Sequence, residues 1–574
     1  MQRLCHVWII VLVVGFLVGI ACKTSNKGLY SQGAGQIPAS NDRDGDGIPD
    51  DWEINGVDYT YPPDGSKHHL DLKNDYGVSP KHKDIFVWVA WMEDATHTHK
   101  PEPEAIAIVK QAFTNAPVQN IDGYPGINVH VVLAPEPIPE KQIIGSVDAE
   151  GNYDWSEYDA LETKYFPKEL QGVFYFCLFA HDIDAEHNSG ITKDIPGREF
   201  IVSLGGFTNM VGTVQEKAGT FMHELGHALG LRHGGVDDTN YKPNYISIMN
   251  YLFQLNGVPI NGVQGNYDYS RFKLDCSESK LNKNTGLTSN PALTKYGTQY
   301  ICCATCKNAN SIPVNVSSIV GTPIDWNCDG TFQPATVATD INGDNTITDL
   351  SGADDWQNIV LKPAGPTSGV RPRSVVGLKV TAEITPKQAD SIRLFPVAGV
   401  RAVKTGTNIF VSWNQIPLDR VLAYRVYRSS TSSPRTEVVG TVDDTAHPSF
   451  TDTSIKGGSY QYFVTAVFAP HSFAVQNGTE NLSVPVKSAE VPSGPVKNAG
   501  RFAAVSPAAA TIGAPIREIA KSEQVAGIRE AAPTKSARYE NLGQTAPQSR
   551  SSSRLFPKNL YETDFSSAAS VVVK

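Results

Sequence analysis

Residues 223–233 read His-Glu-Leu-Gly-His-Ala-Leu-Gly-Leu-Arg-His, the pattern H-E-x-x-H-x-x-G-x-x-H. On a helix, His223 and His227 lie one turn apart and project from the same face, so both imidazoles reach a single ion. Gly230 tolerates the positive φ at which a helix ends, and the turn there brings His233 back as a third ligand. The stretch therefore predicts a zinc site with one open position.

Glu224 adds a catalytic group to this predicted site. Its carboxylate lies beside the metal ligands and is placed to accept a proton from a water molecule. The alternative is an amphipathic helix whose histidines pack in the core without a metal. In either case the apolar back face of the helix would pack against the rest of the domain. The chain holds only 14 histidines in 574 residues. The spacing should therefore arise by chance in fewer than roughly one such chain in a thousand, which favours zinc.

The motif resembles that of the metzincin clan of zinc metallopeptidases. The clan also carries a methionine in a tight turn beneath the metal, and Met249 in the stretch 245–251 follows His233 after a short polar loop. In the astacin-like and serralysin-like branches, a tyrosine two residues past that methionine ligates zinc or stabilises the oxyanion. Tyr251 has this spacing, and the alternative is an ordinary core tyrosine. The residue after the third histidine often distinguishes the metzincin families. Here it is Gly234, which assigns the chain to no branch.

The resemblance implies the layout of residues 61–300, which we expect to form an α+β catalytic domain with a twisted mixed sheet and the zinc helix beneath it. The expected elements are strands over 83–92, 127–133, 173–180 and 199–204, a helix over 101–116 and the zinc helix over 213–231. We expect Glu199–Leu204 to be the edge strand that borders the cleft and pairs with an extended substrate.

The N-terminus predicts export. Residues 1–21 hold a basic start and an apolar run too short for a comfortable membrane span, as in a signal peptide. Gly19-Ile20-Ala21-Cys22 resembles a bacterial lipobox, which implies lipidation of Cys22 and a tether over 22–40 that anchors the protein to a membrane. The alternative is a plain signal peptide and a secreted protein. A net charge of −10 without a basic run argues against nucleic-acid binding.

An acidic loop follows within residues 41–60. Oxygen ligands recur there at the spacing of an EF-hand-like calcium loop, with Gly47 at the turning position. The predicted Ca²⁺ ligands are Asp42, Asp44, Asp46, the Ile48 carbonyl, Asp50 and Glu53. The alternative is an acidic, solvated linker.

Residues 301–370 form a Cys/Asp-rich extension. In an exported protein, the five cysteines between Cys276 and Cys328 indicate disulfides. The acidic runs 325–330 and 340–345 are either further calcium loops or loops rich in Asx turns. Earlier in the chain, polar residues around His181 favour a solvated loop over a second metal site.

His97 and His99 receive the same interpretation as His181, a solvated loop.

At the other end of the chain, residues 397–491 show short alternating strands and a core Trp413, which resemble an all-β fibronectin type III sandwich. Residues 492–574 are rich in alanine, proline and serine and predict a disordered tail.

Together these features predict a surface zinc endopeptidase acting on protein or peptide substrates, with Glu224 as general base. The rival hypothesis is a non-catalytic adhesin with a zinc-stabilised fold that binds proteins through the fibronectin-like domain. The intact Glu224 argues against it, since a binding module needs no base there.

Overall fold

The computed structural model describes residues 41–148, 151–302, 314–361, 383–392, 394–430, 433–471, 560–564 and 566–573. The predicted signal peptide and tether, with the lipidation site Cys22, lie outside these residues. Within the part of the chain that the structure describes, no helix is long and apolar enough to cross a membrane.

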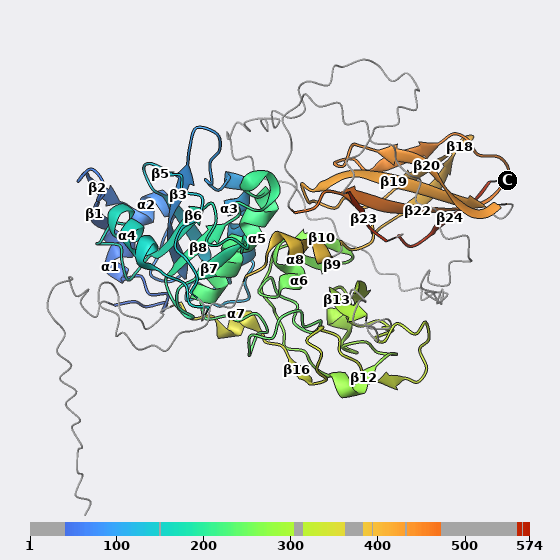
Figure 1. Ribbon diagram of the computed structural model, residues 1–574, viewed down its shortest axis with the longest axis horizontal. Coiled ribbons are helices and arrows are strands. Elements are labelled where there is room, and N and C mark those ends of the chain that lie inside the picture. The colour runs from blue at the N-terminus through green and yellow to red at the C-terminus, as the bar shows by residue number, and fades with distance from the viewer. Residues whose placement is uncertain are drawn as a thin grey trace, which may run out of the picture. The chain divides into compact units, whose positions relative to one another are not determined.

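A six-stranded sheet forms the centre of the first part of the chain (Figure 1). Its strand order is β4-β3-β6-β8-β7, with β5 paired to the end of β3. The strands are β3 (Asp84–Glu93), β4 (Asn128–Leu133), β5 (Ile138–Pro139), β6 (Tyr175–Ala180), β7 (Gly190–Thr192) and β8 (Glu199–Ser203). All pairs are parallel except β7 with β8. The near-continuous apolar sequences of β3 and β6 are typical of parallel strands buried on both faces.

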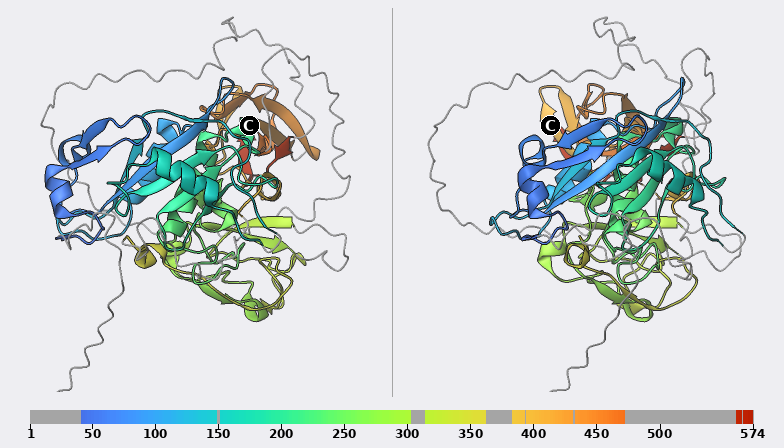
Figure 2. Two further views of the ribbon diagram at one scale, coloured as in Figure 1. Left: turned by 60° about the vertical axis from the view of Figure 1, so that its left-hand side comes forward. Right: turned by 90° about the vertical axis from the view of Figure 1, so that its left-hand side faces the viewer.

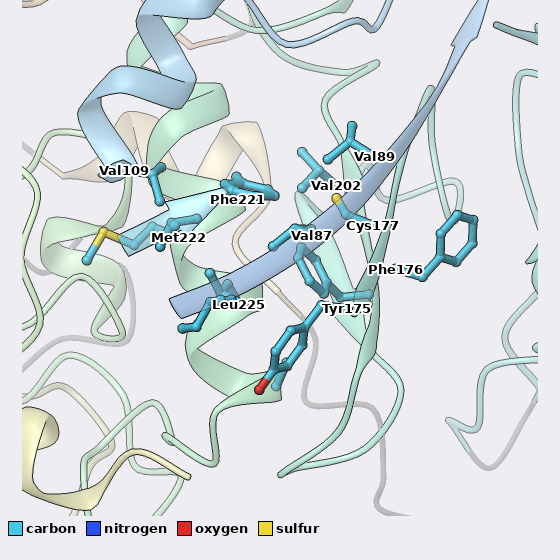
Figure 3. Close-up of a cluster of buried hydrophobic side chains, with 14 of the residues drawn as sticks. Val87, Val89, Val109, Tyr175, Phe176, Cys177, Val202, Phe221, Met222 and Leu225 are labelled. Carbon is cyan, nitrogen blue, oxygen red and sulfur yellow. The ribbon is translucent and has the colours of Figure 1, made fainter. Parts of the chain in front are cut away.

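Helices cover both faces of this sheet. Figure 3 shows Val87, Cys177 and Val202 of three strands facing Phe221 and Leu225 of α5 (Val214–Ala228). The helix α3 (Pro103–Thr114) packs beside α5 and adds Val109 to the same core.

Phe176 alternates to the opposite face of the sheet. There it stacks on Phe166 and contacts Tyr158 of α4 (Ser156–Tyr165), with ring centroids 5.1 and 5.5 Å away. This alternation of side chains along β6 gives each face its own core.

The predicted elements of this region are observed, each end within three residues of its expected position. The predicted edge strand is wrong. β8 lies inside the sheet between β6 and β7, and the short strand β7 forms the edge. Only three residues long, β7 carries too little alternation to be recognised in the sequence.

Smaller elements complete the first part and the region after the zinc-motif helix. Before β3 lie α1 (Asp50–Asn55), β1 (Val57–Thr60), β2 (Lys67–Leu70) and α2 (Leu72–Tyr76). The later ones are α6 (Tyr251–Gln254), β9 (Val258–Ile260), β10 (Val263–Asn266), β11 (Asp275–Ser277), β12 (Leu281–Asn282), β13 (Gly297–Cys302), β14 (Val314–Ile319), β15 (Thr336–Val337), β16 (Asp349–Ser351), α7 (Asp355–Asn358) and α8 (Pro386–Ser391). The 3₁₀ turns are Thr208–Met210, Glu278–Lys280 and Pro291–Leu293.

The C-terminal part is an all-β sandwich of two antiparallel sheets around Trp413, Tyr424 and Tyr462. One sheet holds β17 (Arg401–Thr405), β18 (Asn408–Ser412) and β21 (Ser449–Asp452). The other holds β19 (Val421–Ser430), β20 (Ser433–Val442), β22 (Gly458–Phe468), β23 (Tyr561–Glu562) and β24 (Ala569–Val573).

β23 and β24 come from the predicted disordered tail, so that prediction is wrong for these residues. Both pair with β22, and Figure 2 shows the red C-terminal strands beside the orange ones. Residues 472–559 lie outside the described residues.

Candidate metal centre

Three imidazoles of the motif converge on one point. The Nε2 atom of His227 lies 3.1 Å from Nε2 of His223 and 3.1 Å from Nε2 of His233. All three side chains are buried. His223 and His227 project from α5, which a capping box of Thr213 and Glu216 begins.

The end of α5 positions the third histidine, His233. Gly230 has a φ of 95°, the left-handed conformation that glycine adopts without steric cost. The amide of Leu231 then donates to the carbonyl of Gly226. This turn returns the chain so that His233 faces the two helical histidines.

The hydrogen bonds of these histidines fit a metal ion. Nδ1 of His223 lies 2.8 Å from the carbonyl oxygen of Ile248, and Nδ1 of His227 lies 2.8 Å from that of Leu231. Each Nδ1 therefore carries the proton and each Nε2 presents a lone pair inward. Burial also lowers the pKa of His227 to about 4, which keeps it neutral. Ligands 2.0–2.1 Å from a tetrahedral zinc lie about 3.3 Å apart, close to the distances found.

Glu224 lies fully buried beside these ligands. Its Oε2 accepts a hydrogen bond from Oγ1 of Thr192 on β7 at 2.8 Å, whereas Oε1 has no hydrogen-bond partner among the described residues. Burial raises the pKa of Glu224 well above the usual carboxyl value, and the charge of Glu383 adds to this. A Cβ atom at Gly190 would lie 2.6 Å from Oε1, so the edge strand leaves room for this carboxylate only with glycine there.

Met249 lies in a tight turn under the helix. A Cβ atom at Gly226 would lie 2.3 Å from its Sδ, so the absence of a side chain at Gly226 permits this approach. Asp355 holds the turn, because its carboxylate accepts hydrogen bonds from the hydroxyls of Tyr245 and Ser247 at 2.8 and 2.6 Å. No sequence pattern indicated Asp355, which lies about a hundred residues further along the chain.

The fourth position around the histidines holds a carboxylate that the sequence did not indicate. Oxygens of Glu383 lie 3.1, 3.5 and 3.2 Å from Nε2 of His223, His227 and His233. The hydroxyl of Tyr251 donates to the same carboxylate at 3.2 Å. Burial acts to raise the pKa of Glu383, but the histidines outweigh it and hold that pKa well below its usual value. Tyr251 therefore lies at the site, as its spacing predicted.

The acidic loop forms a buried cluster that differs in part from the prediction. Carboxylate oxygens of Asp46, Glu53 and Asp84 lie within 4.8 Å of one another, as do those of Asp42, Asp44 and Asp46. The structure thus adds one residue that the loop spacing did not include, the first residue of β3.

Burial is the largest cause of the raised pKa values in this cluster, about 6 for Asp44, 8 for Asp46 and 9 for Glu53. Both oxygens of Glu53 lack hydrogen-bond partners among the described residues. Close buried carboxylates, with Glu53 lacking any donor in the described chain, have the chemistry of a divalent cation site, although Nε2 of His130 lies 2.6 Å from Oδ1 of Asp84.

Asp50 is not part of the cluster, contrary to the prediction. Its two oxygens accept hydrogen bonds from the amide and Nε of Arg43, at 3.0 and 2.6 Å. Arg43 lies between the predicted ligands Asp42 and Asp44, and the prediction did not consider that it could bind Asp50 in place of Ca²⁺. Ile48 is buried and its amide donates to Asp46 at 2.7 Å, which fixes the turn.

The first of the later acidic runs does not repeat this arrangement. The buried ammonium of Lys283 donates to Asp325 and Asp329, at 2.8 Å each, where a bound cation would otherwise lie. Asp340 accepts hydrogen bonds from the amides of Gly343 and Asn345, at the same spacing as those that Asp42 accepts from Gly45 and Gly47, so these bonds fit both alternatives. A calcium site at 325–330 is therefore replaced by an internal lysine.

The cysteines agree with the prediction of disulfides in part. Cys328 is disulfide-bonded. Cys177, buried in the sheet, and Cys276 are free thiols. Cys303 and Cys306 lie outside the described residues.

The prediction of solvated loops around His97, His99 and His181 is wrong. The structure brings these histidines together with Glu140, and His99 and His181 are buried. The H-x-H spacing was the available signal, because residues two apart in extended chain point the same way.

No protein-family model and no curated protein matches this chain. Among solved structures, an Fn3-like protein from Clostridium thermocellum is 30% identical over 13% of this chain and 79% of that chain, with a TM-score of 0.12. Pectate lyase PelI from Erwinia chrysanthemi, in complex with tetragalacturonic acid, is 23% identical over 13% of this chain, with a TM-score of 0.12.

Domains from titin are 25% identical over 12% of this chain, with a TM-score of 0.11. This chain spans 24% of the pectate lyase and 25% of the titin chain. The first match makes part of the chain similar to a fibronectin type III-like protein, and these small overlaps indicate no function.

Proposed function

We propose that this chain is a zinc-dependent endopeptidase of the metzincin type, which hydrolyses peptide bonds in protein or peptide substrates. The observation that carries the proposal is the convergence of three buried Nε2 atoms beside a buried glutamate. A packed helix face would not need three ring nitrogens directed at one point, nor the Nδ1 protons of His223 and His227 held by carbonyl groups.

His223, His227 and His233 would hold the zinc ion. Zinc bound there lowers the pKa of water toward about 7 and polarises the scissile carbonyl. Oε1 of Glu224 takes the proton of the attacking water molecule and passes it to the leaving amine. Thr192 fixes the other oxygen of that carboxylate, so the proton is received at a defined atom.

Two further features would position the substrate. The hydroxyl of Tyr251 lies 3.2 Å from the carboxylate at the fourth position, from where it would donate to the oxyanion of the tetrahedral intermediate. The outer edge of β7 would pair with an extended peptide, which would add to the sheet through backbone hydrogen bonds.

Other parts of the proposal concern partners and location. Ca²⁺ would bind the cluster of Asp42, Asp44, Asp46, Glu53 and Asp84 and hold the start of β3 to the acidic loop. A lipid anchor at Cys22 would tether the exported protein to a membrane. No nucleic-acid partner is proposed.

The test compares cleavage of a denatured protein substrate by residues 23–574 with Glu224 intact and with Glu224→Ala, each also carrying Glu383→Gln to open the fourth position. We expect equal zinc content in both, with cleavage reduced by at least about a hundredfold in Glu224→Ala. Equal zinc without cleavage in either protein would favour the adhesin, which would bind proteins through the fibronectin-like sandwich. Equal cleavage in both would refute the role of Glu224.

A further inference from the structure

The cluster of His97, His99, Glu140 and His181, here named the strand-end cluster, lies apart from the zinc motif. Nδ1 of His181 lies 3.2 Å from Nε2 of His97 and 3.2 Å from Nε2 of His99. Oε1 of Glu140 lies 3.7, 3.5 and 3.2 Å from the same atoms of His97, His99 and His181. All four ligand atoms lie within 4.8 Å of one another.

The fold builds this cluster from three neighbouring strands. His99 lies in the loop that follows β3 and donates its amide to Met92 at 2.9 Å. Glu140 directly follows β5 and donates its amide to Glu93 at 3.1 Å, while His181 directly follows β6. Because these strands are parallel, their carboxyl ends meet at one edge of the sheet and bring the side chains together.

Glu140 supplies an independent indication of a ligand. Its side chain is 6% exposed, and neither oxygen makes a hydrogen bond with any described residue. A buried carboxylate without hydrogen bonds is costly unless a cation compensates it. The distances among the histidine nitrogens match the 3.1 Å spacing at the zinc motif, which serves as an internal comparison.

Neighbouring groups hold the histidines in place. Asp94 lies 3.2 Å from Nδ1 of His97. Carboxylates behind metal-bound imidazoles orient them in this way. A Cβ atom at Gly205 would lie 2.3 Å from Cδ2 of His181, so the ring occupies the space that a side chain there would need.

We propose that the strand-end cluster is a second metal site, which binds Zn²⁺ through three imidazole nitrogens and the carboxylate of Glu140. Four protein ligands complete a tetrahedral shell without an open position, which is the property of a structural rather than a catalytic zinc. The metal would tie the loops after β3, β5 and β6 together. The loop after β6 leads to β7, so the metal would also anchor the edge strand.

The test counts zinc in residues 23–574 by mass spectrometry after exhaustive dialysis. We expect two Zn²⁺ per chain in the wild type and in His447→Ala, a matched control that removes an exposed histidine of the sandwich. We expect one in His99→Ala. Two zinc ions in a folded His99→Ala would overturn the proposal.

His227→Ala keeps the proposal testable if His99→Ala does not fold, because it leaves the strand-end cluster intact. Titrated with Co²⁺, it should bind one equivalent with the visible absorption of four-coordinate Co²⁺. Absence of that absorption would overturn the proposal.

A separate observation concerns Glu383, which closes the zinc motif from within the chain. Glu383 and Ile384 are buried, and the carbonyl of Ile384 accepts a hydrogen bond from the amide of Ser189 at 3.1 Å. Ser189 directly precedes β7, so this backbone lies along the edge where an extended substrate would pair. α8 follows at once, and the hydroxyl of Thr385 caps it.

We infer that the segment Glu383–Ile384 holds the enzyme latent by occupying both the fourth metal position and the substrate edge. This inference rests on the proposed function. A ligand for the metal then competes with Glu383. Its apparent affinity is the intrinsic affinity multiplied by the fraction of molecules in which Glu383 has left the site.

The test measures binding of a peptide hydroxamate, a zinc-binding probe, to residues 23–574 by calorimetry. Glu383→Gln should bind it about tenfold or more tightly than the wild type, while Lys387→Ala, an exposed control on α8, should equal the wild type. Equal affinity in Glu383→Gln and wild type, with cleavage that depends on Glu224 in both, would overturn latency and leave the function standing. No hydroxamate binding by zinc-loaded Glu383→Gln, with no cleavage, would overturn both.

Discussion

Replacing Asp355 by asparagine tests how the turn that carries Met249 is held beneath the metal centre. Burial raises the pKa of Asp355 to about 7, whereas an aspartate in an unfolded chain titrates near about 3.9. Between these values the folded chain keeps a proton that the unfolded chain has lost. The free energy of unfolding therefore falls as the pH rises, by about 1.4 kcal/mol per pH unit. Over about three units the loss reaches at most about 4 kcal/mol.

Asparagine removes this titration and keeps the shape. Its oxygen accepts the hydrogen bonds of Ser247 and Ser270, and its amide donates to the hydroxyl of Tyr245, which lies 3.3 Å from the carbonyl of Arg232. Urea unfolding of both proteins at about pH 5 and about pH 8 measures the difference in slope. Asp355→Asn should lose less stability over this range than the wild type by up to about 3 kcal/mol, because about two of the three titrating units lie above pH 5. The same pH dependence in both proteins would refute the argument.

Three further changes give direct tests. Gly226→Ala should lower the free energy of unfolding by about 1–3 kcal/mol in urea, because the new Cβ would lie 2.3 Å from Sδ of Met249 and overpack the turn; the gain of about 1 kcal/mol usual for alanine in a helix would contradict this. In the Glu383→Gln background, Thr192→Val should lower kcat about tenfold at unchanged zinc content, since Glu224 loses the hydrogen bond that orients it; an unchanged kcat would refute that role. Glu53→Gln should reduce the rise in melting temperature that Ca²⁺ produces in scanning fluorimetry, and an undiminished rise would place the calcium elsewhere.

The convergence of the three histidines could be predicted because all of its information is local. The spacing of His223, His227 and His233 depends only on helix geometry and on one turn at Gly230. The strands of the central sheet were equally visible, because parallel strands buried on both faces have continuous apolar sequences.

Residues that reach the site from far along the chain could not be predicted. Glu383 follows His233 by 150 residues, and nothing in its neighbourhood resembles a ligand motif. Asp84 and Asp355 likewise join their sites through tertiary packing alone. The last strand of the sandwich, 569–573, is separated from its partner β22 by a stretch whose composition predicts disorder, so its pairing was hidden.

The strand-end cluster falls between these cases. Its members His97, His99, Glu140 and His181 come from three separate loops, and their approach depends on strand order, which local patterns do not determine. The spacing of His97 and His99 was visible in the sequence. It indicates a metal site only when β3 and β6 are known to be adjacent, because His181 then lies beside these two histidines.

Anomalous X-ray scattering at the zinc edge decides whether the three histidine nitrogens of the zinc motif hold a zinc ion. In crystals of residues 23–574 grown with zinc, we expect an anomalous peak about 2.0–2.1 Å from Nε2 of His223, His227 and His233. The same peak should vanish in His227→Ala. A folded wild-type protein with no peak among these nitrogens would contradict the account.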